Sequence, residues 1–346
     1  MKKIAIMLVI IVVVAFPVSA AEFTAPQAPD SAQPYMPENT ESFGQGLAQI
    51  IKKAVALLEP DLAQGAAVCL SLIAVTVLIS LLHSFPGSSK RTVDLAGAVA
   101  ISLLLLRPSN TFIELGTTTV HELSEYSKLF FPVMTAALAA QGGVTASAAL
   151  YSGTMFFVSV LSSAVSKLIV PVLYIYLCLC VSNMAIGEAY LKNMQKFIKW
   201  IMTWALKLVL YIFTGYISIT GVISGTADAA AVKAAKLTIS GVVPVVGSII
   251  SDASETILVS ASVMKSAVGV YGLLVILAIW LGPFLKIGVQ YLLLKITASV
   301  CDIFGAKSAS GLIHDFSGAM GLTLAMAGTV CLLLLISAVC FMKGVS

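Results

Sequence analysis

Long uncharged apolar segments recur along this chain and restrict its fold more than any other feature. Two of them, 62–82 and 322–341, contain no charged residue. Each is about 20 residues long, the length with which an α-helix crosses ~30 Å of hydrocarbon. Only 10% of the 346 residues are charged and 59% are hydrophobic, too few charges to cover a water-soluble chain of this length. The sequence therefore predicts an all-α integral membrane protein, a polytopic helical bundle.

The remaining apolar segments are shorter or are softened by Gly, Ala and Ser. They are 93–106, 129–140, 148–165, 168–186, 204–223, 268–281 and 283–300. Segment 93–106 cannot span ~30 Å at 1.5 Å per residue unless it borrows flanking residues or tilts. We therefore expect about six to nine crossings, with short or broken helices among them.

The amino-terminal residues divide into three parts. Residues 1–21 have the basic start, short apolar run and small residues of a cleavable signal peptide, although an uncleaved first span is the alternative. Residues 22–46 are rich in Pro and polar residues, so we expect an exported, extended tether. The membrane domain, 47–346, opens with helically spaced apolar residues that predict an interfacial amphipathic helix.

A basic helix is predicted at 188–207. Lys192, Lys196 and Lys199 share one face of it, and Trp200 and Trp204 lie at the border with the apolar face. This pattern is typical of a helix at the headgroup level on the cytoplasmic side. The lysines either only set the topology or also form a docking surface for a cytoplasmic partner.

A helix break is predicted at 241–247, where Gly241 and Gly247 flank Pro244. Broken backbone at membrane depth must be buried in protein or line a water-filled cavity. We therefore consider 241–247, with Asp252 and Glu255 after it, a candidate re-entrant turn. An ordinary helix-loop-helix outside the bilayer is the alternative.

Small and charged residues mark other helix surfaces. Two pairs, Gly221 with Gly225 and Gly321 with Ala325, are spaced for close helix packing. Lys286 lies in an apolar stretch, where a cation faces a partner or a cavity unless it snorkels to the surface, which is the simpler expectation.

Catalytic and cofactor-binding patterns are missing from the sequence. His121 and Glu122 lack the second histidine of a helical zinc site, and there is no phosphate-binding loop or nucleophile elbow. We expect no enzyme activity, no catalytic or metal site and no cofactor. The net charge of +4 gives no nucleic-acid footprint.

Several short motifs follow one another in a specific order. They are VKAAK at 232–236, VVPVVG at 242–247, SDASET at 251–256, KSAVG at 265–269 and PFLK at 283–286. Together they resemble the stage III sporulation protein AE family, from about residue 41 to the end of the chain.

The resemblance implies a multi-pass protein in the mother-cell membrane around the forespore of an endospore-forming bacterium. It implies a permease-like or export-gate-like part of the channel complex that joins the two cells after engulfment. The implied partners are a cytoplasmic ATPase, ring-forming intermembrane proteins and a forespore-side channel protein, besides the lipid bilayer. A stand-alone secondary solute transporter and a membrane scaffold for complex assembly are the alternatives.

Overall fold

The computed structural model describes residues 25–37, 42–85, 89–242 and 247–343, with backbone only for 220–265. The described residues form helices and no strand, which confirms the predicted all-α class. The elements are η1 (Gln33–Tyr35), α2 (Phe43–Ala56), α3 (Glu59–Ser84), α4 (Lys90–Ala140), α5 (Val144–Ala164), the π-helix η2 (Val165–Ile169), α6 (Val170–Ile186), α7 (Ala189–Val242), α8 (Gly247–Ile303) and α9 (Lys307–Lys343).

Among the described residues, six helical segments are long and apolar enough to cross a membrane, and α5, η2 and α6 together form one of them. This number lies at the lower end of the predicted range because three pairs of predicted spans are each one continuous segment. Segments 93–106 and 129–140 lie in α4, 148–165 and 168–186 in α5–η2–α6, and 268–281 and 283–300 in α8. The expectation that these spans are separate helices is therefore wrong.

Three of the described prolines lie inside long helices without ending them. Pro108 and Pro132 lie inside the 51-residue α4, and Pro283 lies inside the 57-residue α8. Membrane helices tolerate proline because neighbouring groups satisfy the freed backbone carbonyls. At 1.5 Å per residue α4 is about 77 Å long, more than twice the hydrocarbon thickness.

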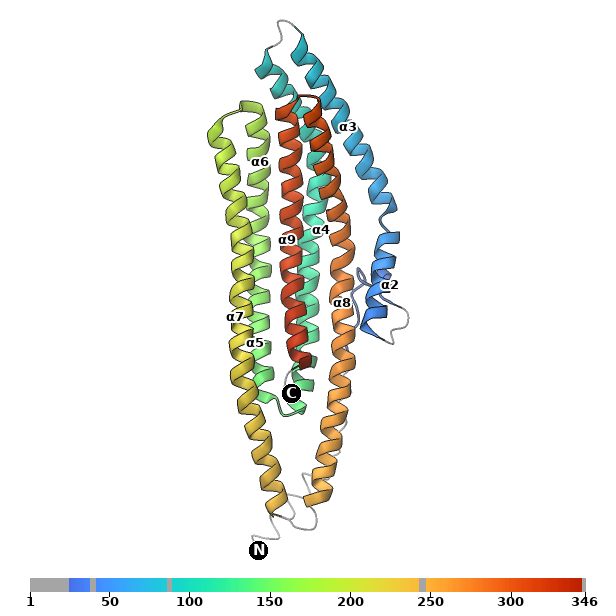
Figure 1. The fold of residues 1–346 in the computed structure, drawn as a ribbon, viewed down its shortest axis with the longest axis vertical. Coiled ribbons are helices and arrows are strands. Elements are labelled where there is room, and N and C mark those ends of the chain that lie inside the picture. The colour runs from blue at the N-terminus through green and yellow to red at the C-terminus, as the bar shows by residue number, and fades with distance from the viewer. Residues whose placement is uncertain (1–24, 38–41, 86–88, 243–246, 344–346) are drawn as a thin grey trace.

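The helices run up and down along one long axis (Figure 1). The ends of α3, α6 and α8 and the starts of α4, α7 and α9 lie toward one end, whereas the end of α7 and the start of α8 lie toward the other. We call the first the basic end, because it carries Lys90, Arg91, Lys192 and Lys307. Lys and Arg in short loops tend to be retained in the cytoplasm, which predicts that the basic end faces the cytoplasm.

The core lies where α9 packs between α4 and α8 (Figure 1). Phe130 and Phe131 of α4 are fully buried, and Phe131 meets Phe341 of α9 with ring centroids 5.4 Å apart. Gly272 of α8 permits this packing, since a Cβ there would lie 2.0 Å from the Phe130 ring. Large aromatic residues and glycine together set the distance between the central helices.

The Pro-rich segment before α2 packs on the bundle over its described residues 25–37. Tyr35 is 8% exposed and covers Gly282 of α8, and the Ser31 hydroxyl donates to Glu122 of α4 (2.7 Å). The Lys53 ammonium of α2 donates to the Met36 carbonyl (2.9 Å). The expectation of an extended segment is wrong here, because the Tyr35 ring packs against Gly282 and holds the segment on the bundle. Export and signal cleavage concern residues outside the described ranges and stay predictions.

Helix α2 is amphipathic, as the sequence predicts. Ile50 and Ala54 are buried, and Ile51 and Val55 are exposed apolar residues beside exposed Lys52. The Ser42 hydroxyl caps the helix by accepting from the Gln45 amide (3.4 Å). The helix contacts α8 and leads directly into α3.

Candidate functional site

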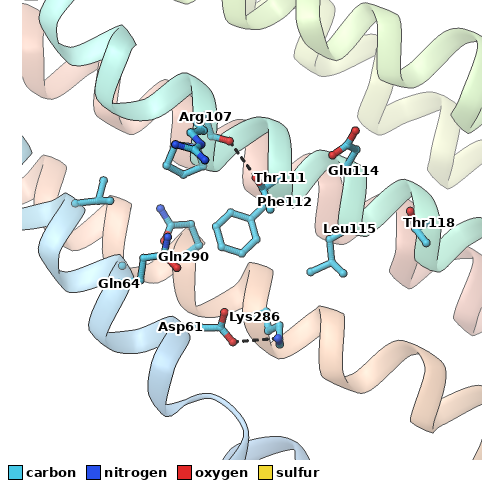
Figure 2. Close-up of a pocket in the computed structure, with 13 residues that line it drawn as sticks. Asp61, Gln64, Arg107, Thr111, Phe112, Glu114, Leu115, Thr118, Lys286 and Gln290 are labelled. Atoms are coloured by element: carbon cyan, nitrogen blue, oxygen red, sulfur yellow. Dashed lines mark hydrogen bonds and ion pairs between the residues drawn. The ribbon is translucent and has the colours of Figure 1, made fainter. Parts of the chain in front are cut away.

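A cavity of about 810 Å³ lies between α3, α4 and α8 (Figure 2). It is unusual for a bundle this apolar, because four charged side chains gather around it. The lining residues are Asp61, Gln64, Gly65, Val68, Arg107, Pro108, Thr111, Phe112, Glu114, Leu115, Thr118, Lys286 and Gln290. Charged side chains on membrane-length helices are expensive and generally mark a functional site.

An ion pair joins two walls of the cavity. The Lys286 ammonium of α8 lies 3.2 Å from a carboxylate oxygen of Asp61 on α3, and both side chains are partly buried. Lys286 therefore has a partner, and the simpler expectation that it snorkels is wrong. Either charge alone would be costly in this position, and the pair removes most of that cost.

The third wall is one face of α4. Arg107, Thr111, Glu114 and Thr118 recur at helical spacing and all line the cavity. The Thr111 hydroxyl donates to the Arg107 carbonyl (3.2 Å). Figure 2 shows Arg107 on the Gln290 side of the cavity, whereas Glu114 is turned away from the Asp61–Lys286 pair. Within the described part of the chain the Arg107 guanidinium forms no ion pair.

Close packing of α3 on α8 places a buried amide in the cavity wall. Gln290 is 4% exposed, and a Cβ on Gly65 would lie 3.2 Å from its Oε1 and 2.7 Å from Leu293. Glycine at position 65 is thus what allows α3 to approach Gln290. Among the described residues the Gln290 side chain has no hydrogen-bond partner, so its amide is available to a ligand.

Helix geometry gives the depth of the cavity. Asp61, Arg107 and Lys286 each lie about 26–35 Å along their helix from the basic end, at 1.5 Å per residue. This distance matches the ~30 Å of hydrocarbon in a bilayer. If the α3 flank spans the bilayer from the basic end, the cavity lies at the opposite headgroup level.

The predicted basic face lies on α7, away from this cavity. Lys192, Lys196 and Lys199 are all exposed, and the Lys199 ammonium lies against Gly318 of α9. Trp200 and Trp204 are exposed and stack with ring centroids 6.2 Å apart. The three lysines therefore form one accessible surface at the basic end.

The predicted re-entrant turn lies only partly within the described residues. Gly241 belongs to the last turn of α7 and Gly247 begins α8, at the end opposite the basic end (Figure 1). Pro244 and the side chains of Asp252 and Glu255 lie outside what the structure describes. Along α8, Gly247 is about 58 Å from Lys286, so the fold does not bring this segment to the cavity.

The predicted packing residues are placed in two helices. Gly221 and Gly225 belong to the part of α7 described by backbone only. On α9, a Cβ at Gly321 would meet the Tyr291 ring of α8 at 3.4 Å, and Ala325 packs against the core. This second pair thus lies where α9 contacts its neighbours in the chain.

Sequence reasoning missed the cavity, although three of its charges are visible as interruptions of apolar sequence. Asp61 precedes the apolar run of α3, Arg107 follows that of α4, and Lys286 interrupts that of α8. A common distance from the basic end is the signal that could have grouped them.

The helical bundle and its cavity lie within the region shared with known proteins. The family described as stage III sporulation protein AE matches residues 35–344. This chain belongs to that family. Stage III sporulation protein AE of Bacillus subtilis (strain 168) is 21% identical over 240 residues, which cover 68% of this chain and 60% of the relative. No solved structure matches. Membership supports a role in sporulation for this AE family protein, and the matched region includes the motifs at 232–286.

Proposed function

We propose that this AE family protein is a non-enzymatic membrane component, permease-like or export-gate-like, of the channel complex between mother cell and forespore. It would be required for endospore development after engulfment. The observation that carries the proposal is the charged cavity within six membrane-length helices. A protein that only fills space between lipids has no use for a cavity that gathers Asp61, Arg107 and Lys286 where the apolar spans end.

The proposed location is the mother-cell membrane around the forespore, with the basic end in the mother-cell cytoplasm. There the exposed Lys192, Lys196 and Lys199 form a surface for an acidic patch on the cytoplasmic ATPase. The cavity, about one bilayer thickness away, faces the intermembrane space, where the ring-forming proteins and the forespore-side partner would meet it.

The test is deletion of the gene in its own host, followed by measurement of forespore volume and late forespore-specific reporter expression after engulfment. We expect small forespores and silent late reporters, both restored by the wild-type gene. Normal forespores in the deletion strain would overturn the proposal.

Complementation with cavity variants links this phenotype to the structure. Asp61→Ala and Lys286→Ala should each fail to restore the late reporters, whereas the swapped pair Asp61→Lys with Lys286→Asp should restore them partly. Lys295→Ala is the matched control, because Lys295 lies on the same helix and its ammonium group interacts with Tyr291 and with no carboxylate among the described residues. If all variants are present at wild-type protein levels and complement equally well, the cavity is not needed for the function.

A further inference from the structure

The cavity combines polar groups that can bind an anionic head group with an apolar lining. Arg107 and the buried Gln290 amide supply hydrogen-bond donors on one side. Val68, Pro108 and Phe112 supply apolar contacts. This combination suits an amphipathic ligand rather than a bare ion or a fully polar solute.

The charges leave Arg107 free to bind an anion. Asp61 is already neutralised by Lys286 at 3.2 Å. Glu114 is turned away from that pair, whereas Arg107 lies near Gln290 (Figure 2). A guanidinium presents its donors as a planar fork that fits two oxygens of a phosphate or carboxylate, and an adjacent amide adds a further donor.

The cavity also opens toward the surface of the bundle. On α4, Arg107, Thr111 and Thr118 line the cavity and are also exposed at the surface of the bundle. Nearer the basic end, Val99 and Leu103 of α4 precede Arg107 at four-residue spacing and project outward with exposures of 57% and 71%. An acyl chain that leaves a head group at Arg107 toward the bilayer centre would therefore run along an apolar surface.

From these observations we infer that the cavity binds the phosphate of an anionic phospholipid. Arg107 and Gln290 hold the phosphate at the headgroup level opposite the basic end, and the acyl chains lie along Val99 and Leu103. The ligand class follows from a phosphate-binding fork, an apolar lining and a bilayer-level opening in one site. The inference is independent of the proposed channel role, because it concerns binding alone.

Lipid retention by the purified full chain tests this inference. The chain is exchanged into detergent containing equal amounts of dioleoyl phosphatidylglycerol and dioleoyl phosphatidylcholine, and bound lipid is counted by native mass spectrometry. We expect wild type to retain phosphatidylglycerol and Arg107→Gln to bind it about tenfold or more weakly, the usual effect of losing a charge-assisted bond. Arg91→Gln, an arginine at the start of the same helix and 16 residues before Arg107, should bind as wild type does.

Each other outcome overturns the inference. Equal weakening by Arg91→Gln and Arg107→Gln would mean diffuse attraction of anionic lipid to any cation. Equal retention of both lipids by wild type would exclude recognition of the anionic head group, and this arm does not depend on any variant folding. Competition by millimolar sn-glycerol 3-phosphate as strong as by phosphatidylglycerol would identify a soluble phosphate compound as the ligand. Arg107→Lys keeps the charge but not the fork, and it should lie between wild type and Arg107→Gln.

Discussion

Helices α3 and α7 form two flanks on opposite sides of the bundle (Figure 1). Their exposed residues differ most where the two helices are equally far from the basic end. Contacts fix their relative levels. Gly97 of α4 lies against both Ile79 of α3 and Met184 of α6, and Gln195 of α7 donates to the Leu179 carbonyl of α6 (2.8 Å). The beginning of α7 is therefore level with the apolar run of α3.

At this shared level the two flanks are suited to different surroundings. The α3 surface exposes Leu70, Leu78 and Leu81, whereas the α7 surface exposes its lysines and stacked tryptophans. At the beginning of α7, exposed Met194 and Phe197 alternate with these lysines, and an exposed surface without charged residues begins only at Leu208, with Tyr211, Ile212 and Ile219. A flat bilayer of ~30 Å matches both flanks only if the bundle axis is inclined to the membrane normal. The bilayer then lies nearer the basic end on α3 than on α7.

The largest expected effect is on membrane insertion, when an arginine is placed on α3 or on α7 at the same distance from the basic end. Leu70→Arg should reduce correctly inserted protein strongly, because arginine at the centre of a span costs about 2.5–3.5 kcal/mol. Ile201→Arg, at nearly the same level on α7, should cost less than about 1 kcal/mol because arginine there joins a basic, interfacial surface. Insertion is measured as the membrane-embedded fraction of each variant at equal synthesis. Equal loss in both variants would remove the difference between the flanks.

The second largest effect is expected at the ion pair between Asp61 and Lys286, where the apolar part of α3 meets the cavity. Asp61→Ala leaves Lys286 partly buried without its partner, and we expect a loss of about 1–3 kcal/mol in stability. The readout is the thermal unfolding midpoint in lipid nanodiscs. Asp61→Ala with Lys286→Met should recover part of the loss, since no unpaired charge remains. An unchanged midpoint in Asp61→Ala would show that water already solvates Lys286.

Much of the fold was predictable because it depends on local patterns. Uncharged apolar runs gave the spans 62–82 and 322–341, and helical spacing gave α2 and the basic face of α7. The merged helices were not predictable from hydropathy. The polar residues between 107 and 128 look like a loop between two spans, but α4 simply continues through them because its backbone bonds are internal to the helix.

The candidate site was not predictable because it depends on register between distant helices. Asp61 and Lys286 pair only because α3 and α8 pack with one particular offset, which Gly65 and Gln290 fix. From the sequence, snorkelling is the simpler prediction for Lys286, since a partner far away in the chain is invisible. The same holds for Tyr35, whose niche over Gly282 exists only in the folded bundle.

A smaller effect tests how the segment before α2 is held on the α3–α8 side. Tyr35→Ala removes the ring from Gly282, and burial of such a ring contributes about 1.5–3 kcal/mol. The loss should appear as local release rather than global unfolding. We expect faster hydrogen–deuterium exchange at the amides of Ala32, Tyr35 and Met36, which are hydrogen-bonded in this segment. Tyr190→Ala on α7 is the control, because Tyr190 is exposed; equal exchange in both variants would mean that Tyr35 does not hold the segment.

The smallest expected effect is the change in stability of Lys196→Gln. Its sign shows whether water and headgroups or lipid tails surround the beginning of α7. Lys196 is exposed and forms no ion pair within the described residues, so Lys196→Gln should change stability by less than about 0.5 kcal/mol if the side chain lies in water or among headgroups. If lipid tails surrounded this segment, removal of the charge would instead stabilise the protein, because a charge is costly in hydrocarbon. The midpoint of thermal unfolding in nanodiscs separates the two cases, with Lys286→Gln as a control that should lower it by breaking the pair with Asp61. A clear rise in the midpoint of Lys196→Gln would place the beginning of α7 within the bilayer and make an inclined bundle unnecessary.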